Sequence, residues 1–65
     1  MTKAGRQRLF KTWMKEGYDL HVEGRLDGLA WNKWSWLCYK FQDEEITVEQ
    51  LIAELIRIEE KHNVR

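Results

Sequence analysis

The alternation of apolar and polar positions is clearest in the last third of the chain. Between residues 48 and 58 the apolar positions fall within an arc of about 160° when each residue turns by about 100°, as in an α-helix. Thr47 and Gln50 stand at the start of this arc. Their spacing is that of a capping box, in which each side chain bonds the other residue's backbone N–H. These features predict a helix over residues 47–62.

The first third of the chain also has a helical pattern. Its larger apolar residues recur at helical spacings and are Leu9, Phe10, Trp13 and Met14. Thr2 is a suitable N-cap, and Gly17 is a suitable residue to follow the last helical position. We therefore predict a helix over residues 2–16.

The segment after Gly17 has a different period. Residues 18–23 alternate between apolar and polar side chains, which is typical of a half-buried extended segment. Gly24 follows and suits a turn, so the chain could return as a short β-hairpin over residues 18–26. An irregular loop fits this segment equally well. A hairpin of this size is marginal alone in water and would have to pack on the helices.

The stretch from Trp31 to Phe41 holds three of the four tryptophans in the chain. As a strand, neither of its faces would be purely apolar. As a helix, it places six residues within an arc of about 120°: Ala30, Trp31, Trp34, Leu37, Cys38 and Phe41. Asp27 is a suitable N-cap for such a helix. The pattern therefore predicts a helix over residues 28–41, and a strand remains the alternative because aromatic residues favour strands.

These elements make one small, mostly α domain over residues 1–65. We expect three helices with a short extended segment or β-hairpin between the first two, and an α+β fold stays open. A chain of this length buries only about 60% of its unfolded surface, so dense aromatic packing is expected to stabilise it. The predicted core consists of Leu9, Phe10, Trp13, Trp31, Trp34, Leu37, Phe41, Leu51, Leu55 and Ile58.

The formal net charge is zero, but the charges are unevenly spread. Residues 1–16 carry five basic residues against one acidic residue, and residues 35–65 carry four basic against seven acidic. The single cysteine excludes an internal disulfide and suits a reducing compartment. No apolar run reaches the ~20 residues of a membrane span, and the N-terminal segment lacks the apolar region of a secretory signal. We therefore expect a cytoplasmic protein with no membrane association.

The residues that carry catalytic or metal chemistry form no recognisable motif. The glycines match no phosphate-binding loop, and no cysteine or histidine pair has zinc-finger spacing. Cys38 lies within the apolar arc, where packing explains it better than catalysis with a histidine. A metal site formed by His21, Cys38 and His62 is a weak alternative, because His62 fits better as a cap at the helix end. We predict no enzyme, no cofactor and no metal.

Two aromatic residues fall outside the apolar arc of the second helix. Trp36 and Tyr39 lie on its far side, near Asn32. Exposed aromatic residues are enriched at protein–protein interfaces. We therefore expect a non-enzymatic protein-binding module, acting as a small inhibitor or adaptor, with Trp36, Tyr39 and Asn32 as its partner-binding residues. Its small size is analogous to that of the inhibitors that phages and mobile elements direct at host enzymes.

Two other surfaces support alternative functions. Arg8, Lys11 and Lys15 lie on one side of the first helix and could contact nucleic acid phosphates. A sequence pI near 6.7 makes this less favoured than protein binding. The wide apolar arc of residues 48–58 holds more aliphatic surface than a small monomer easily buries, which leaves a homodimer open.

Overall fold

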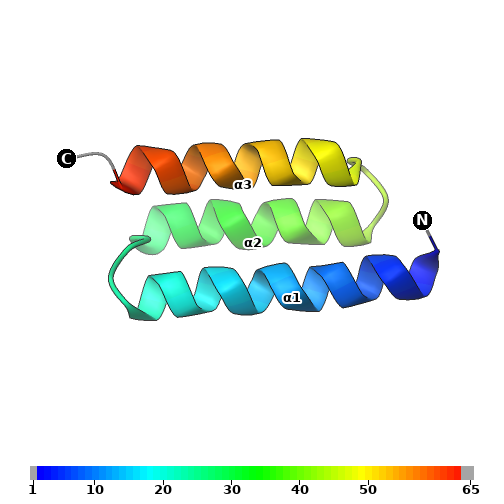
Figure 1. The fold of residues 1–65 in the computed structure, drawn as a ribbon, viewed down its shortest axis with the longest axis horizontal. Helices are drawn as coiled ribbons and strands as arrows, with labels where there is room; N and C mark the ends of the chain where they lie inside the picture. Colours follow the sequence, from blue (N-terminus) through cyan, green and yellow to red (C-terminus); the bar gives the residue numbers. More distant parts are fainter. Residues whose placement is uncertain (1, 64–65) are drawn as a thin grey trace.

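The computed structural model describes residues 2–63, and its side chains as far as residue 61. Three helices occupy most of this range: α1 (Lys3–Val22), α2 (Gly28–Gln42) and α3 (Val48–Asn63). The helices α1 and α3 run in one direction and α2 runs in the opposite direction (Figure 1). This confirms the small helical domain and settles the aromatic stretch as a helix.

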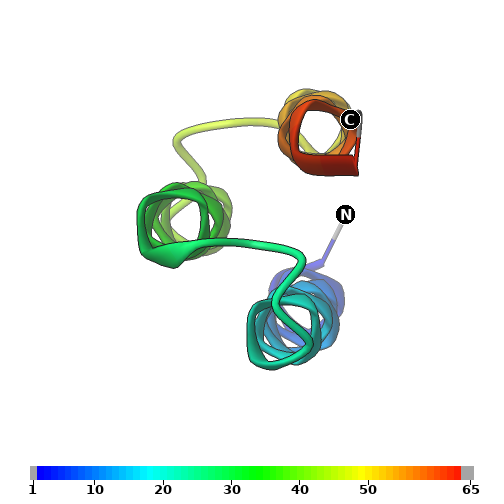
Figure 2. The same cartoon turned by 90° about the vertical axis from the view of Figure 1, so that its left-hand side faces the viewer.

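Helix α2 is the central element of the fold. It packs against both α1 and α3. Seen end-on, the three helices form a triangle with α2 at one corner (Figure 2). The molecule is elongated, with extents of 38 × 19 × 14 Å. One side of α2 is therefore buried by its two neighbours, and its opposite side faces outward.

The capping residues inferred from the sequence begin all three helices. The side chains of Thr2 and Asp27 each accept a hydrogen bond from the backbone N–H three residues later, at 3.0 Å and 2.8 Å. The backbone N–H of Thr47 donates to the Gln50 side chain at 2.9 Å, and the N–H of Gln50 donates to the Thr47 hydroxyl at 3.1 Å. The capping box is thus confirmed, and each helix begins with an orphan N–H satisfied.

The predicted end of the first helix at Gly17 is wrong. Gly17 is buried in the interior of α1, which continues to Val22. A Cβ atom at residue 17 would overlap the indole of Trp34. The Nε1–H of that indole donates to the main-chain carbonyl of Trp13 at 2.8 Å. Glycine stands here because α2 approaches α1 closely, and it is not a helix stop.

The extended segment or β-hairpin predicted over residues 18–26 is also wrong, since no strand occurs within residues 2–63. The alternating apolar residues do not share one face. Leu20 is buried, whereas Tyr18 and Val22 are exposed one helical turn apart on α1. The ring of Tyr18 lies edge-on to Trp31, with centroids 6.2 Å apart. The alternation of apolar and polar residues over 18–23 therefore does not reflect a strand. It arises because this part of α1 carries two exposed apolar residues as well as a buried one.

Both connections between helices leave the preceding helix in the same way. After α1, Gly24 has a φ of 82°, and the N–H groups of Gly24 and Arg25 bond carbonyls of the last turn at 3.0 Å and 2.9 Å. After α2, Glu44 has a φ of 64°, and Glu44 and Glu45 form the equivalent bonds at 3.1 Å and 2.9 Å. This is the Schellman arrangement, which requires a left-handed residue. Glu44 adopts that conformation without being glycine.

The core lies where the three helices face one another. Six residues of the predicted core are buried: Trp34, Leu37, Phe41, Leu51, Leu55 and Ile58. Four others pack half-buried at its edge: Leu9, Phe10, Trp13 and Trp31. The structure adds four buried residues that the predicted core lacked: Leu20, Leu26, Ala30 and Cys38. Much of the apolar arc of α3 is therefore buried within one chain.

Arg6 fastens the start of α1 to the connection between α2 and α3. Its Nη1 donates to the carbonyls of Phe41 and Ile46 at 2.7 Å and 3.3 Å. Its guanidinium carbon also lies 4.6 Å from the centroid of the Phe41 ring. Arg6 thus bonds both the end of α2 and the connection after it, and we assign it to the fold and not to a basic binding surface.

Candidate partner-binding surface

The outward side of α2 carries a row of exposed residues, which we call the α2 face: Leu29, Asn32, Trp36 and Tyr39. Their spacings of three, four and seven residues place them on one side of the helix. Leu29, Trp36 and Tyr39 are 81%, 55% and 52% exposed. The structure thus brings the three residues singled out in the sequence onto one surface, with Leu29 beside them.

Trp36 differs from the buried tryptophan two residues before it. The indole N–H of Trp34 is bonded within the core, whereas the indole N–H of Trp36 has no acceptor among residues 2–63. Lys40 Nζ lies 4.4 Å from the centroid of the Trp36 ring. An exposed cation–π contact of this kind contributes only about 0.5–1 kcal/mol. The Trp36 side chain therefore contributes little to the stability of the fold.

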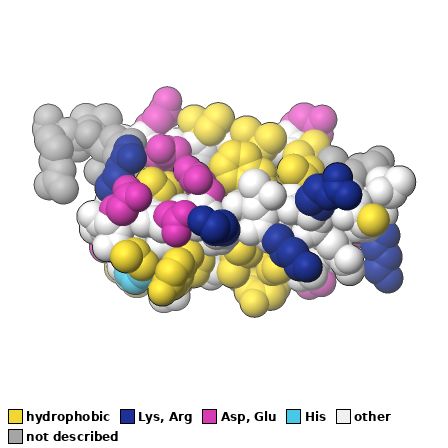
Figure 3. Space-filling model, turned by 60° about the horizontal axis from the view of Figure 1, so that its bottom comes forward, with side chains coloured by type: hydrophobic (Ala, Val, Ile, Leu, Met, Phe, Trp, Pro, Cys, Tyr) yellow, Lys and Arg dark blue, Asp and Glu magenta, His cyan; other side chains and the backbone are white. Residues whose placement is uncertain are grey.

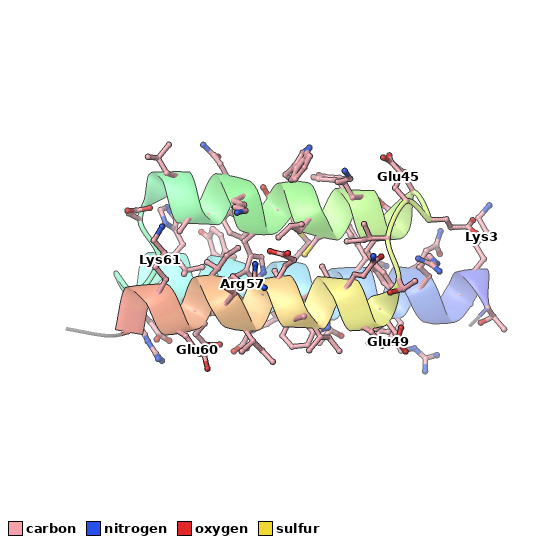
Figure 4. All side chains as sticks on the ribbon, turned by 90° about the horizontal axis from the view of Figure 1, so that it is seen from above. Lys3, Glu45, Glu49, Arg57, Glu60 and Lys61 are labelled. Carbon is pink, nitrogen blue, oxygen red and sulfur yellow. The ribbon has the colours of Figure 1, made fainter. Side chains whose placement is uncertain are left out.

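Trp36 also borders an open groove between α2 and α3, which we call the α2–α3 groove. Its volume is about 420 Å³, within the range of sites that take a ligand or a partner side chain. The two helices that form it lie side by side in Figure 4. The groove is lined by Lys33, Trp36, Leu37, Lys40, Ile46, Gln50, Ala53 and Glu54.

The two rims of the groove carry different charges. On the α2 rim, Lys33 and Lys40 form no ion pair within the described part of the chain. On the α3 rim, Glu54 Oε2 lies 3.8 Å from Arg57 Nη1. Because Arg57 offsets the charge of Glu54, the groove has an excess of positive charge on its α2 side.

The other two members of the α2 face have different neighbours. The Tyr39 ring packs on Phe10 of α1, with centroids 5.2 Å apart and an interplanar angle of 55°. Asn32 is exposed, and its main-chain carbonyl accepts a hydrogen bond from the Ser35 hydroxyl at 3.0 Å. Part of the Tyr39 ring is thus covered by Phe10 of α1, whereas Trp36 lines the groove.

The basic residues of α1 are exposed, but they are not all available. Lys15 Nζ bonds Asp19 at 3.0 Å, and this hydrogen bond and the charge of Asp19 raise the pKa of Lys15 above its usual value. Arg8 and Lys11 are exposed on the same helix. On the face shown in Figure 3, most acidic side chains lie toward one end, and most basic side chains lie from the middle toward the other. Lys15 is therefore partly neutralised, and Arg8 and Lys11 remain of the predicted basic surface.

The residues considered for catalysis or metal binding lie apart. Cys38 is fully buried, and its burial raises the pKa of the thiol to about 11. His21 stacks on Trp31, and its Nδ1–H donates to the Leu26 carbonyl at 2.8 Å. Among the described residues, no three side chains of the metal-binding types come together. The predicted capping role of His62 lies outside the described side chains.

Three features of this surface were missed in the sequence. Leu29 stands seven residues before Trp36, so the helical period would have placed it on the same side. Lys33 and Lys40 lie outside the apolar arc of this segment, and no local pattern marks them as a pair. The groove itself depends on how α3 packs against α2, which local periodicity does not specify.

Comparison with protein families, curated proteins and solved structures gives no match to this chain. Its function therefore has to be inferred from its own surface. Within the described part of the chain, none of the helices combines the length and apolarity that crossing a membrane requires.

Proposed function

We propose that the chain is a non-enzymatic protein-binding module, a small inhibitor or adaptor that contacts its partner with the α2 face. The observation that carries this proposal is the exposure of Trp36 beside the α2–α3 groove. Tryptophan is the residue type most enriched among interface hot spots. Leu29 and Tyr39 extend the apolar surface on the same side of α2. The single buried thiol suits a reducing compartment such as the cytosol.

The proposal rests on the difference between Trp34, which the fold requires, and Trp36, which is exposed to a partner. Trp34 fills the core and bonds the α1 backbone, while the Trp36 ring is half exposed and its indole N–H has no acceptor among residues 2–63. A partner that covers Trp36 would bury its apolar ring and supply an acceptor for that N–H. Apolar burial contributes about 25 cal/mol for each Å² removed from water, so a ring of this size is a strong anchor.

A peptide-display selection on the intact chain tests this function. We expect enriched peptides that bind the wild-type chain and lose at least about tenfold in affinity on Trp36→Ala, as at a hot spot. Tyr18→Ala is the matched control, because it removes an equally exposed aromatic ring from α1, away from the α2 face. Peptides that bind both variants equally, or a selection that enriches nothing, would contradict the proposal.

A further inference from the structure

We infer that the α2–α3 groove binds an acidic amphipathic helix of a partner protein. In this arrangement an apolar side chain of the partner lies against Trp36, and carboxylates on either side of it pair with Lys33 and Lys40. The inference rests on the proposed function and deepens it by naming the chemistry of the partner.

The positive charge of the α2 rim is the first argument. Lys33 and Lys40 are seven residues apart, which is about 10.5 Å along a helix at 1.5 Å per residue. Neither forms an ion pair within residues 2–63. Across the groove, Glu54 has Arg57 as its neighbour, so it competes weakly for these lysines. Two carboxylates of a partner, placed about two helical turns apart, would form ion pairs with both lysines.

The shape of the groove is the second argument. Two helices packed in opposite directions form its sides, and Leu37, which is almost fully buried, lies on its lining with Ile46. Grooves of this kind take a helix through apolar anchors at spacings of three, four and seven residues. A helix running along α2 repeats its side chains with the same period as the two lysines. One apolar anchor between two acidic residues therefore matches Trp36 between Lys33 and Lys40.

The contact between Lys40 and Trp36 in the unbound chain would be exchanged for contacts with the partner. Lys40 Nζ lies 4.4 Å from the ring centroid of Trp36. When a carboxylate binds Lys40, the ammonium group moves from the ring to the new ion pair. The exposed face of the indole then becomes available to the apolar anchor.

Acidic residues at one end of the groove set the register. Asp43, Glu44 and Glu45 form the exposed connection next to Ile46, and Glu45 lies at this end in Figure 4. They would repel a continuous phosphate chain laid along the groove. A peptide avoids them because it can place acidic residues beside the lysines and a neutral or basic residue beside this connection. This favours an acidic helix over single-stranded nucleic acid.

A charge-swap experiment tests the chemistry of the partner. The probe is a display library of helix-forming peptides about fifteen residues long, or about 22 Å, randomised on one face. We expect the wild-type chain to enrich peptides with two acidic residues seven apart and a large apolar residue between them. The double variant Lys33→Glu, Lys40→Glu should bind their synthetic forms at least about tenfold more weakly. Lysine-substituted peptides should regain binding to that variant, and Lys11→Glu on α1 should change nothing.

Each contrary result has a distinct meaning. Enriched peptides that require Trp36 but are neutral or basic would overturn the acidic helix and leave the proposed function standing. Binding that is independent of Trp36 would overturn both. Oligothymidylate that binds through Trp36 would replace the peptide with nucleic acid. A dimer of the wild-type chain in sedimentation equilibrium that Trp36→Ala dissociates would make a second copy the occupant.

Discussion

Trp34 occupies the space that a side chain at Gly17 would need. A Cβ atom at residue 17 would overlap the Trp34 indole and lie 2.8 Å from Cζ3 of Trp31. Replacing a glycine inside a helix by alanine ordinarily stabilises the helix by about 0.5–1 kcal/mol. We predict the opposite for Gly17→Ala: a loss of about 1–3 kcal/mol in the free energy of unfolding, because Trp34 is fully buried and cannot move aside. Urea unfolding measures this difference.

Gly28→Ala is the matched control for that substitution. Gly28 begins α2, and a Cβ atom there meets nothing within 4 Å. We expect its free energy of unfolding to stay within about 0.5–1 kcal/mol of wild type, on the stabilising side. If Gly17→Ala proved as stable as Gly28→Ala, the close approach of α1 and α2 at Trp34 would be wrong.

Arg6 and Arg8 are both basic residues of α1 with different roles. Arg6 donates to one carbonyl at the end of α2 and to one in the connection that follows, and Arg8 is exposed. We predict that Arg6→Ala lowers the free energy of unfolding by about 1–3 kcal/mol, because the part-buried Ile46 carbonyl loses the Arg6 donor and the Phe41 carbonyl is left with only the N–H of Glu44. Arg8→Ala should change it by no more than about 0.5 kcal/mol. Equal effects in thermal or urea unfolding would show that Arg6 does not fasten the helices.

Glu44 holds a left-handed backbone conformation, with a φ of 64°. That conformation costs a residue with a side chain about 1–2 kcal/mol, and glycine adopts it freely. We predict that Glu44→Gly raises the free energy of unfolding by about 0.5–1 kcal/mol after the added flexibility of the unfolded chain is counted. Glu45→Gly, where φ is not positive, should lower it. A loss of stability in Glu44→Gly would rule out the Schellman ending of α2.

The thiol of Cys38 should make the domain less stable in alkaline solution. Its pKa is raised by burial to about 11 in the folded chain, from 9.0 for the ordinary thiol. Between these values the unfolded chain loses the proton and the folded chain keeps it, so rising pH favours unfolding. The free energy of unfolding should fall by up to about 1.4 kcal/mol per pH unit in this window.

Cys38→Ala isolates this effect, because it removes the thiol and leaves every other ionisable group in place. We expect a shallower decline in the variant between pH 9 and about 11 when urea unfolding is repeated at each pH. Parallel pH profiles would mean that the Cys38 thiol is not shielded from water in the folded chain.

The three helices could be predicted because their signals are local. Thr2, Asp27 and the pair Thr47 and Gln50 all cap as expected, since a cap needs only residues three positions apart. The end of α1 could not be predicted in this way. A glycine after Lys15 and Glu16 is typical of the end of a helix. Gly17 instead lies inside α1, because Trp34 of α2 packs against it and leaves no space for a side chain.

The candidate surface was predictable in part for the same reason. The helical period placed Trp36 and Tyr39 away from the core of α2, and both are exposed. The groove beside Trp36 and the role of Arg6 involve residues from separate helices. Which helices lie side by side, and at what rotation, depends on the tertiary packing. Periodicity within one segment carries no information on it.

The most direct test of the central claim compares folding and binding in Trp36→Ala. The account predicts a melting temperature within several degrees of wild type, because Trp36→Ala removes only an exposed cation–π contact of about 0.5–1 kcal/mol. It also predicts at least about a tenfold loss of affinity for the peptides selected on the wild-type chain. A variant that unfolds would place Trp36 in the core, and a stable variant with unchanged affinity would show that Trp36 does not anchor the partner.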